Sequence, residues 1–111
     1  MAEGFAELLK RIEGATGADR ALDRRIAEVL DRPKPTEQAL DYTASVDHCI
    51  ALIGRVLPHW AWHVGYGPRG ILPYATLHDE EERFEAVAPT VPLALLAALL
   101  KARIAVDRER T

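Results

Sequence analysis

The sequence has little cysteine and no long apolar run, and these absences exclude several kinds of protein. A single cysteine cannot form an internal disulfide or a cysteine-rich zinc site, and it is typical of a reducing compartment. The longest apolar run, residues 91–100, is about half the length of a membrane span. Residues 1–10 are charged and lack the apolar core of a secretory signal. We therefore expect a cytoplasmic protein with no membrane partner.

Basic residues are too few for a general nucleic-acid binder. The chain of 111 residues holds 14 Lys and Arg against 17 Asp and Glu, which gives a formal net charge of -3. Nucleic-acid binding needs surplus basic side chains that displace counterions from phosphates. With 49% hydrophobic residues, the length suits one domain with one core. We predict a single domain over residues 1–111 and no nucleic-acid partner.

The strongly charged N-terminal segment predicts two amphipathic helices. Apolar residues recur at helical spacing in the first helix: Phe5, Leu8, Leu9 and Ile12. Asp19 is suited to cap the second, whose apolar stripe is formed by Leu22, Ile26, Val29 and Leu30. Its polar residues are expected to face solvent: Arg20, Asp23, Arg24, Glu28 and Asp31. Prolines then end the helix, so residues 1–37 comprise a helical segment and a short linker that begins at Arg32.

Residues 38–106 are predicted to form the core, which begins and ends with a helix. Ser45, or Thr43 just before it, is a suitable N-cap for a helix over residues 45–57. Thr90 is expected to cap a final helix over residues 91–106, where Pro92 is tolerated in the first turn. The final helix is apolar around most of its circumference, as in buried helices and helices at subunit contacts.

Between these helices the apolar period changes to two, which predicts strands. Large side chains alternate with smaller ones over residues 60–66, and residues 71–77 form the partner strand of a hairpin. Pro73 indicates an edge or bulge position for that second strand. A third strand is predicted over residues 83–88.

The predicted fold class is α+β, with a small, mainly antiparallel sheet of two to four strands sandwiched by α-helices. The helices at residues 45–57 and 91–106 are expected to pack on this sheet. The N-terminal helices are expected to cover its opposite face or an edge.

Three stretches carry a resemblance to a known family. Residues 41–47 (DYTASVD) open a helix, residues 60–62 (WAW) lie in a strand, and residues 88–102 (APTVPLALLAALLKA) lead into the final helix. In this order they resemble small phage and prophage proteins with an α-β-α (ABA) sandwich domain, over about residues 7–106. The order Pro92-Leu93-Ala94 departs from the Pro-Ala-Leu of that family, and Leu96 stands where a cysteine is frequent. The resemblance implies a fold and a phage or prophage origin, but no catalytic residue and no activity.

Residues 65–70 (GYGPRG) match the dinucleotide-binding pattern G-x-G-x-x-G in letters only. That motif requires a helix immediately after it, whereas a strand is predicted here. Pro68 also removes an amide that a phosphate would need. We interpret this stretch as a hairpin turn with glycines at positive φ, and we predict no cofactor.

The histidines are the next candidates for metal binding or proton transfer. The spacing of His59 and His63 brings imidazoles together on a helix but separates them by about 13 Å on a strand. His78 and Asp79 lie at the far end of the second strand and approach His59 if the hairpin is antiparallel. We predict no metal site. A small enzyme, or a ligand-binding or metal-binding protein, that uses these four residues stays an alternative.

No combination of residues predicts a nucleophile site. Asp47, His48 and Cys49 are consecutive, and consecutive helical residues point about 100° apart, so they do not form a hydrogen-bonded relay. Cys49 falls on the apolar face of its helix and is predicted to be a small buried hydrophobe. The acidic run of residues 79–82 is expected to be a solvated loop. We predict no catalytic residue and no enzyme activity.

Aromatic residues gather in the predicted hairpin: Trp60, Trp62, Tyr66 and Tyr74. We expect this hairpin to cover the helices, and any exposed part of its aromatic face to bind protein, since Trp and Tyr dominate interface hot spots. An edge strand there could also pair with a second copy of the chain. We predict a prophage-type accessory protein that acts by protein–protein binding, with a host protein, a phage protein or a second copy as its partner. A virion or assembly component is a further alternative.

Overall fold

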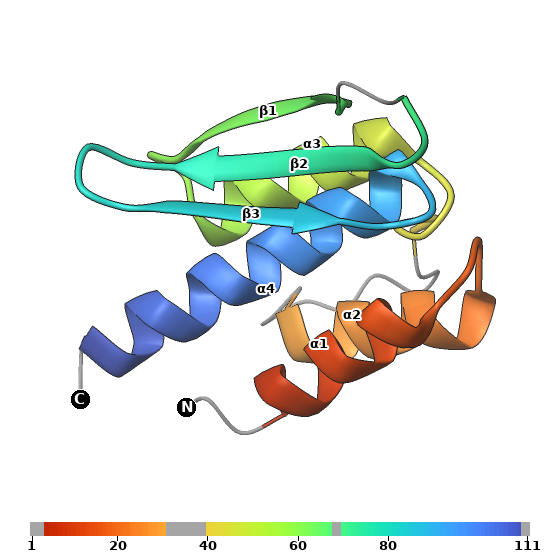
Figure 1. Cartoon of the computed structure of the whole chain (residues 1–111). Coiled ribbons are helices and arrows are strands. Elements are labelled where there is room, and N and C mark those ends of the chain that lie inside the picture. The colour runs from red at the N-terminus through yellow and green to blue at the C-terminus, as the bar shows by residue number, and fades with distance from the viewer. Residues whose placement is uncertain (1–3, 31–39, 68–69, 110–111) are drawn as a thin grey trace.

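The computed structural model describes residues 4–30, 40–67 and 70–109 of the chain. These residues form, in order, α1 (Phe5–Gly14), α2 (Arg20–Leu30), α3 (Val46–Val56), β1 (Ala61–Tyr66), β2 (Pro73–His78), β3 (Arg83–Val87) and α4 (Val91–Glu109). The predicted α+β class, with helices packed on a small antiparallel sheet, is confirmed (Figure 1). The predicted linker lies outside the described residues.

Three of the helices begin at the caps that the sequence predicts. Asp19 Oδ1 accepts a hydrogen bond from the Leu22 amide (3.1 Å) at the start of α2. Ser45 Oγ accepts from the His48 amide (3.2 Å), so Ser45 and not Thr43 caps α3. Thr90 Oγ1 accepts from the Leu93 amide (3.3 Å) at the start of α4. Each side chain thereby satisfies an amide that the first helical turn leaves without a partner.

The sheet is antiparallel, with the strand order β1-β2-β3. β2 is therefore the central strand, which corrects the edge or bulge position that Pro73 indicated. Pro73 is the first residue of β2, where a missing N–H costs only a bond at the end of the ladder. Pro73 therefore marks the first residue of β2, but it does not indicate whether the strand lies at the edge or in the centre of the sheet.

Helix α4 lies in the middle of the molecule, with the sheet on one side and α1 on the other (Figure 1). Residues 92–100 are all buried, because this helix is apolar on every side and needs cover all round. We expected the N-terminal helices on the opposite face or an edge of the sheet. Helix α1 packs instead on α4, which places the helical layers on one side of the sheet.

The outer face of the sheet carries polar side chains and stays open to solvent over much of its area. Exposed residues on this face come from all three strands: Ala61, His63, His78, Arg83, Glu85 and Val87. Within the described residues, no helix is both long enough and apolar enough to cross a membrane.

Candidate protein-binding surface

The strand register separates the hairpin's aromatic side chains onto two faces. Trp62 lies opposite Leu77, and Leu77 lies opposite Phe84, so these side chains share the face that covers the helices. Trp60 belongs to the same face, because its ring lies 5.9 Å from the ring of Phe84. Tyr74 lies opposite Gly65 and points to the outer face. The four predicted aromatic residues therefore do not form one surface.

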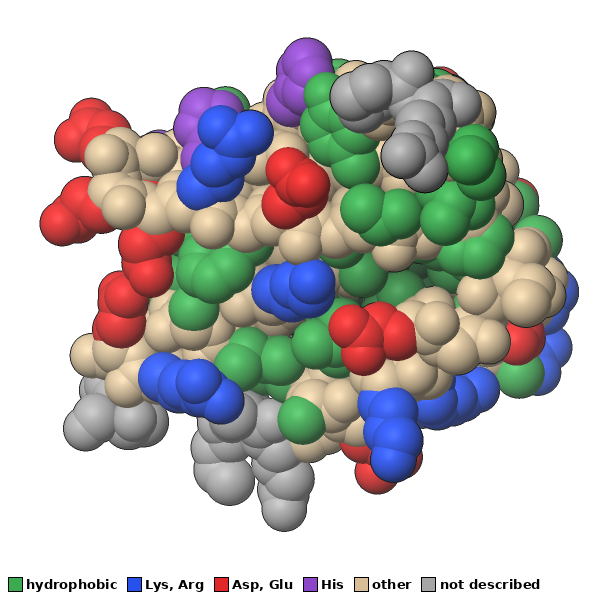
Figure 2. Space-filling model, in the orientation of Figure 1, with side chains coloured by type: hydrophobic (Ala, Val, Ile, Leu, Met, Phe, Trp, Pro, Cys, Tyr) green, Lys and Arg blue, Asp and Glu red, His purple; other side chains and the backbone are tan. Residues whose placement is uncertain are grey.

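Exposure distinguishes the aromatic residues on the helix-facing side. Trp60 is half-buried against Phe84 and belongs to the rim of the core. Trp62 and Tyr66, both on β1, are 41% and 59% exposed. After the turn that follows β1, Ile71 and Leu72 are 74% and 44% exposed. We call Trp62, Tyr66, Ile71 and Leu72 the aromatic edge. Figure 2 shows hydrophobic side chains gathered near the end of the sheet where β1 and β2 are joined.

The backbone of β1 adds polar groups that have no strand partner among the described residues. In an antiparallel strand, the N–H and C=O of one residue point to the same side, and the side alternates along the strand. The amide of Ala88 donates to the carbonyl of Pro73 (3.3 Å), so the backbone carbonyl of Pro73 is directed toward β3. The backbone N–H and C=O of the next residue, Tyr74, are therefore directed toward β1. By the register, the β1 residues that pair with β2 are Ala61, His63 and Gly65. The groups directed away from the sheet belong to Trp62, Val64 and Tyr66.

The opposite edge of the sheet, formed by β3, carries charged side chains and is partly covered by α4. β3 presents Arg83 and Glu85, whereas β1 contains no Asp, Glu, Lys or Arg. The ammonium of Lys101 on α4 donates to the carbonyl of Glu85 (3.0 Å), which occupies one acceptor of the outer edge of β3. Charged side chains and covering groups keep strand edges from pairing with other chains. β1 is thus the open edge of the two.

On the outer face, His63 and Tyr74 form a pair. Their atoms Nε2 and Oη are 3.1 Å apart, and the ring centres are 5.8 Å apart. The Tyr74 ring also covers Gly65, where an added Cβ would lie 3.1 Å from Oη. Thr76, which pairs with His63 in the register, is buried, and its hydroxyl has no hydrogen-bond partner among the described residues. On this otherwise exposed face, His63 and Tyr74 are thus engaged with each other across neighbouring strands.

The predicted His and Asp candidates do not come together as one site. The antiparallel register places His78 opposite Ala61, at the end of β1 that begins near His59. His63 lies farther along β1 and is paired with Tyr74. Among the described residues, no group of three or more His, Cys, Asp or Glu side chains has the geometry to hold a metal ion.

The acidic run forms the turn between β2 and β3. The Asp79 carboxylate accepts from the amides of Glu82 (2.7 Å) and Glu81 (2.9 Å), and these bonds lower the pKa of Asp79. A hydrogen bond with the Glu109 carboxyl, followed by desolvation and nearby negative charge, raises the pKa of Glu82. Asp79 is thus engaged by its own turn.

The glycine-rich stretch is followed by β2 and not by a helix, so the structural context of a dinucleotide site is absent there. The Gly70 amide donates to the Gly67 carbonyl (2.8 Å) and closes a turn. Gly70 has φ of +62°, as predicted, whereas Gly65 and Gly67 do not have positive φ. Pro68 and Arg69 lie outside the described residues.

Cys49 is buried and has the features of a structural thiol. Its Sγ donates to the carbonyl of Tyr42 (3.0 Å). Burial, and then the charge of Asp23, raise the pKa of Cys49 to about 12. A thiol held neutral in this way is a poor nucleophile. The expected buried position of Cys49 is confirmed.

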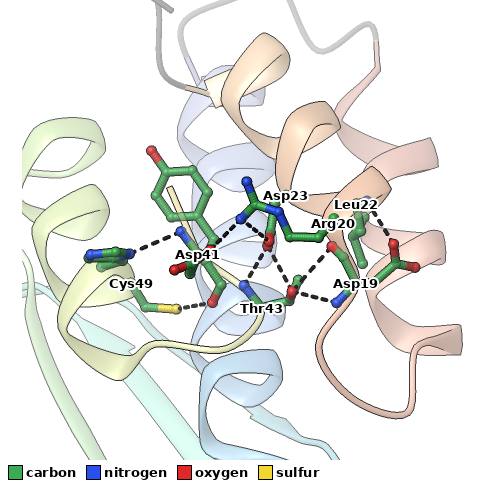
Figure 3. Close-up of polar contacts among 9 residues, drawn as sticks. Asp19, Arg20, Leu22, Asp23, Asp41, Thr43 and Cys49 are labelled. Atoms are coloured by element: carbon green, nitrogen blue, oxygen red, sulfur yellow. Dashed lines mark hydrogen bonds and ion pairs between the residues drawn. The ribbon is translucent and has the colours of Figure 1, made fainter. Parts of the chain in front are cut away.

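A polar network joins α2 to the segment before α3 (Figure 3). Asp23, which we expected to face solvent, is 1% exposed. Its carboxylate accepts from the amide and the hydroxyl of Thr43 (2.7 Å each) and from Arg20 (3.1 Å). Arg20 also forms an ion pair with Asp41. These contacts explain the burial of the charge, and they are structural rather than chemical in role.

Ile71 and Leu72 were not expected at the surface, because a strand was predicted over residues 71–77. β2 begins only at Pro73, so both residues stand in the connection, outside the ladder. Their neighbours Gly70 and Pro73, both typical of turns, are the signal that could have identified them.

Comparisons with known proteins show no similarity: no family model matches the chain, and no curated protein or solved structure matches it. The resemblance of residues 7–106 to phage and prophage proteins therefore stays an expectation from the sequence.

Proposed function

We propose that this protein is a non-enzymatic accessory protein that acts by binding a protein through its aromatic edge. The observation that carries the proposal is an uncharged edge strand with Trp62 and Tyr66 exposed to 41% and 59%. Trp and Tyr contribute large contact areas at little cost in side-chain entropy and dominate interface hot spots. The open N–H and C=O groups of β1 add the capacity to pair with a strand.

The proposal includes a prophage origin, which the sequence pattern supports. Its basis is the order of the helix start at residues 41–47, the WAW strand and the terminal helix. A non-enzymatic role also agrees with the structure, because the side chains best suited to catalysis are engaged in structural contacts. His63 is paired with Tyr74, Asp79 with its turn amides, and Cys49 with a backbone carbonyl.

A photo-reactive phenylalanine analogue at position 66, introduced in the cell that makes the protein, tests this proposal. We expect a covalent adduct with a protein after irradiation, because Tyr66 is the more exposed of the two aromatic residues of the aromatic edge. The matched control carries the analogue at Val87, which is 58% exposed on the other edge of the sheet. That position is expected to give no specific adduct.

Equal adducts from both positions, or none from position 66, would contradict the proposal. A thermal-shift screen with divalent metal ions and nucleotides adds an independent check. A ligand that binds the native state raises the melting temperature by mass action. A rise with one of these ligands would favour the alternative of a ligand-binding protein.

A further inference from the structure

The free edge of β1 selects for an uncharged partner strand. Its outward backbone groups belong to Trp62, Val64 and Tyr66, and a charged partner residue there would lose hydration with no opposite charge to meet it. β3 is a poor alternative, because Lys101 occupies the Glu85 carbonyl on its outer edge. Among the described residues, the strand of the required kind is β1.

The spacing of the exposed side chains suits a pairing of β1 with itself. Trp62 and Tyr66 lie two residues before and two residues after Val64, and all three share the helix-facing side. A two-fold axis perpendicular to the sheet, midway between the Val64 residues of the two copies, would place each Trp62 opposite the second copy's Tyr66. It would also place Val64 opposite Val64 of the second copy. Each exposed aromatic ring then covers the other.

We infer that a second copy of this chain pairs antiparallel with β1 about Val64 and extends the sheet across a dimer. This inference rests on the proposed function, since it names the protein that the aromatic edge binds. The helices of both copies would lie on the same side of the joined sheet.

The backbone pattern favours this register. Residues whose backbone N–H and C=O are directed out of the sheet must lie opposite one another to form hydrogen-bonded pairs, and each pair exchanges two bonds. The register about Val64 forms three such pairs, and so about six hydrogen bonds. A register about His63 would place Tyr66 opposite Trp60, whose amide already donates to the Leu57 carbonyl (3.1 Å). The Val64 register therefore uses all the open groups of the strand and requires none that are occupied.

The small surface area that the dimer would bury indicates a weak, reversible association. Full cover of Trp62 and Tyr66 would remove roughly 200 Å² from solvent on each copy, from their exposed fractions and typical aromatic areas. A standard stable interface buries about 800 Å² per partner, so the strand backbone must supply much of the rest. We expect an association in the micromolar range or weaker.

Sedimentation equilibrium across protein concentrations up to about 1 mM tests the inference. The unaltered chain is expected to shift from monomer to dimer. Val64→Pro removes an outward N–H that β2 does not use, and so two of the about six bonds in the dimer. Because one such bond contributes about a factor of five, dimerisation should weaken about 25-fold. Val87→Pro is the matched control: it removes an outward N–H from β3 and should leave dimerisation unchanged.

A second measurement avoids any dependence on the folding of a proline variant. Trp62→Lys and Tyr66→Glu both alter exposed side chains, and each chain alone should dimerise more weakly than the unaltered chain. Mixed together, the two chains should form a heterodimer, because the lysine of one then lies opposite the glutamate of the other. The remaining Trp62 and Tyr66 keep their native pairing in that complex.

A chain that stays monomeric at all concentrations would overturn the inference, as would equal effects of Val64→Pro and Val87→Pro. Failure of the mixed chains to associate would overturn the register about Val64. The proposed function is judged separately by the adduct from position 66. An adduct with a different protein, together with a monomeric chain, would sink the dimer and leave protein binding standing.

Discussion

The amide nitrogen and the hydroxyl of Thr43 both lie 2.7 Å from the same carboxylate oxygen of Asp23, twenty residues earlier in the chain. Asp23 is 1% exposed, so its charge depends on these donors and on Arg20. The Thr43 hydroxyl also accepts from the Asp19 amide (2.8 Å). One threonine thus connects the start of α2 to the segment that leads into α3.

Replacing Thr43 with valine should destabilise the protein, because it keeps the shape of the side chain but removes one donor from a buried carboxylate. We expect the free energy of unfolding to fall by about 1–3 kcal/mol. Urea denaturation followed by circular dichroism measures this loss. Thr43→Ser, which keeps the hydroxyl, should recover most of it.

The matched control is Thr16→Val, at an exposed position. It should change stability by less than about 0.5 kcal/mol. If Thr43→Val cost no more than this control, the hydroxyl would not be what stabilises Asp23.

The Cys49 thiol should resist alkylation in the folded protein. With a pKa of about 12, only about one thiol in ten thousand is ionised at pH 8, and the group is buried as well. Iodoacetamide labelling followed by mass spectrometry should therefore be slow in buffer and fast in denaturant. Rapid labelling of the native chain at its full stability would show that the thiol is open to solvent.

The same thiol predicts a loss of stability at alkaline pH. Its folded pKa, about 12, is raised above the ordinary value of 9.0, so the unfolded chain releases the proton first. The stabilisation is complete below about pH 9 and is lost as the pH rises toward 12. The free energy of unfolding should fall by up to about 1.4 kcal/mol per pH unit from this group. Cys49→Ala should show a smaller slope, since the other alkaline groups are unchanged; equal slopes would refute the assignment.

Gly65 and Tyr74 should be energetically coupled. An added Cβ at Gly65 would lie 3.1–3.3 Å from atoms of the Tyr74 side chain, so Gly65→Ala must shift this side chain by a few tenths of an ångström and strain its pairing with His63. We expect Gly65→Ala to destabilise the protein by about 1 kcal/mol. In a Tyr74→Ala background the same change should be neutral or stabilising, because alanine restricts the unfolded chain more than glycine.

A double-mutant cycle measured by denaturation gives the coupling directly. A coupling energy above about 0.5 kcal/mol is expected for residues in contact. Additive effects of the two substitutions would show that the ring does not rest on Gly65.

The sequence predicts the local features of this fold and misses those that depend on distant partners. Ser45, Thr90 and Asp19 cap their helices as expected, because capping involves residues only three positions apart. Asp23 was wrongly placed in solvent, since its main partner Thr43 follows after a segment that carries no periodic signal. Local pattern cannot show such a contact.

The same distinction applies to the layers and to the candidate surface. The alternation over residues 60–66 predicts β1, but not which edge of the sheet it forms. Its edge position follows from the strand order, and β3 is the less open edge because Lys101 of a distant helix donates to the Glu85 carbonyl. Likewise, an apolar α4 predicts burial on all sides, but amphipathic helices such as α1 can cover either the sheet or α4. The outcome depends on tertiary packing.

Because α4 lies in the middle of the molecule, truncating buried side chains on different sides of this helix should destabilise the protein. Leu95 and Leu96 are both 0% exposed, although consecutive helical residues point about 100° apart. Leu95→Ala and Leu96→Ala should therefore each leave a cavity and lower the free energy of unfolding by about 2–5 kcal/mol. Leu72→Ala, at a site 44% exposed on the aromatic edge, should cost clearly less. If only one of the two helix variants were destabilised, α4 would have an uncovered side, and the packing of α1 against it could not be the reason for the helix's burial.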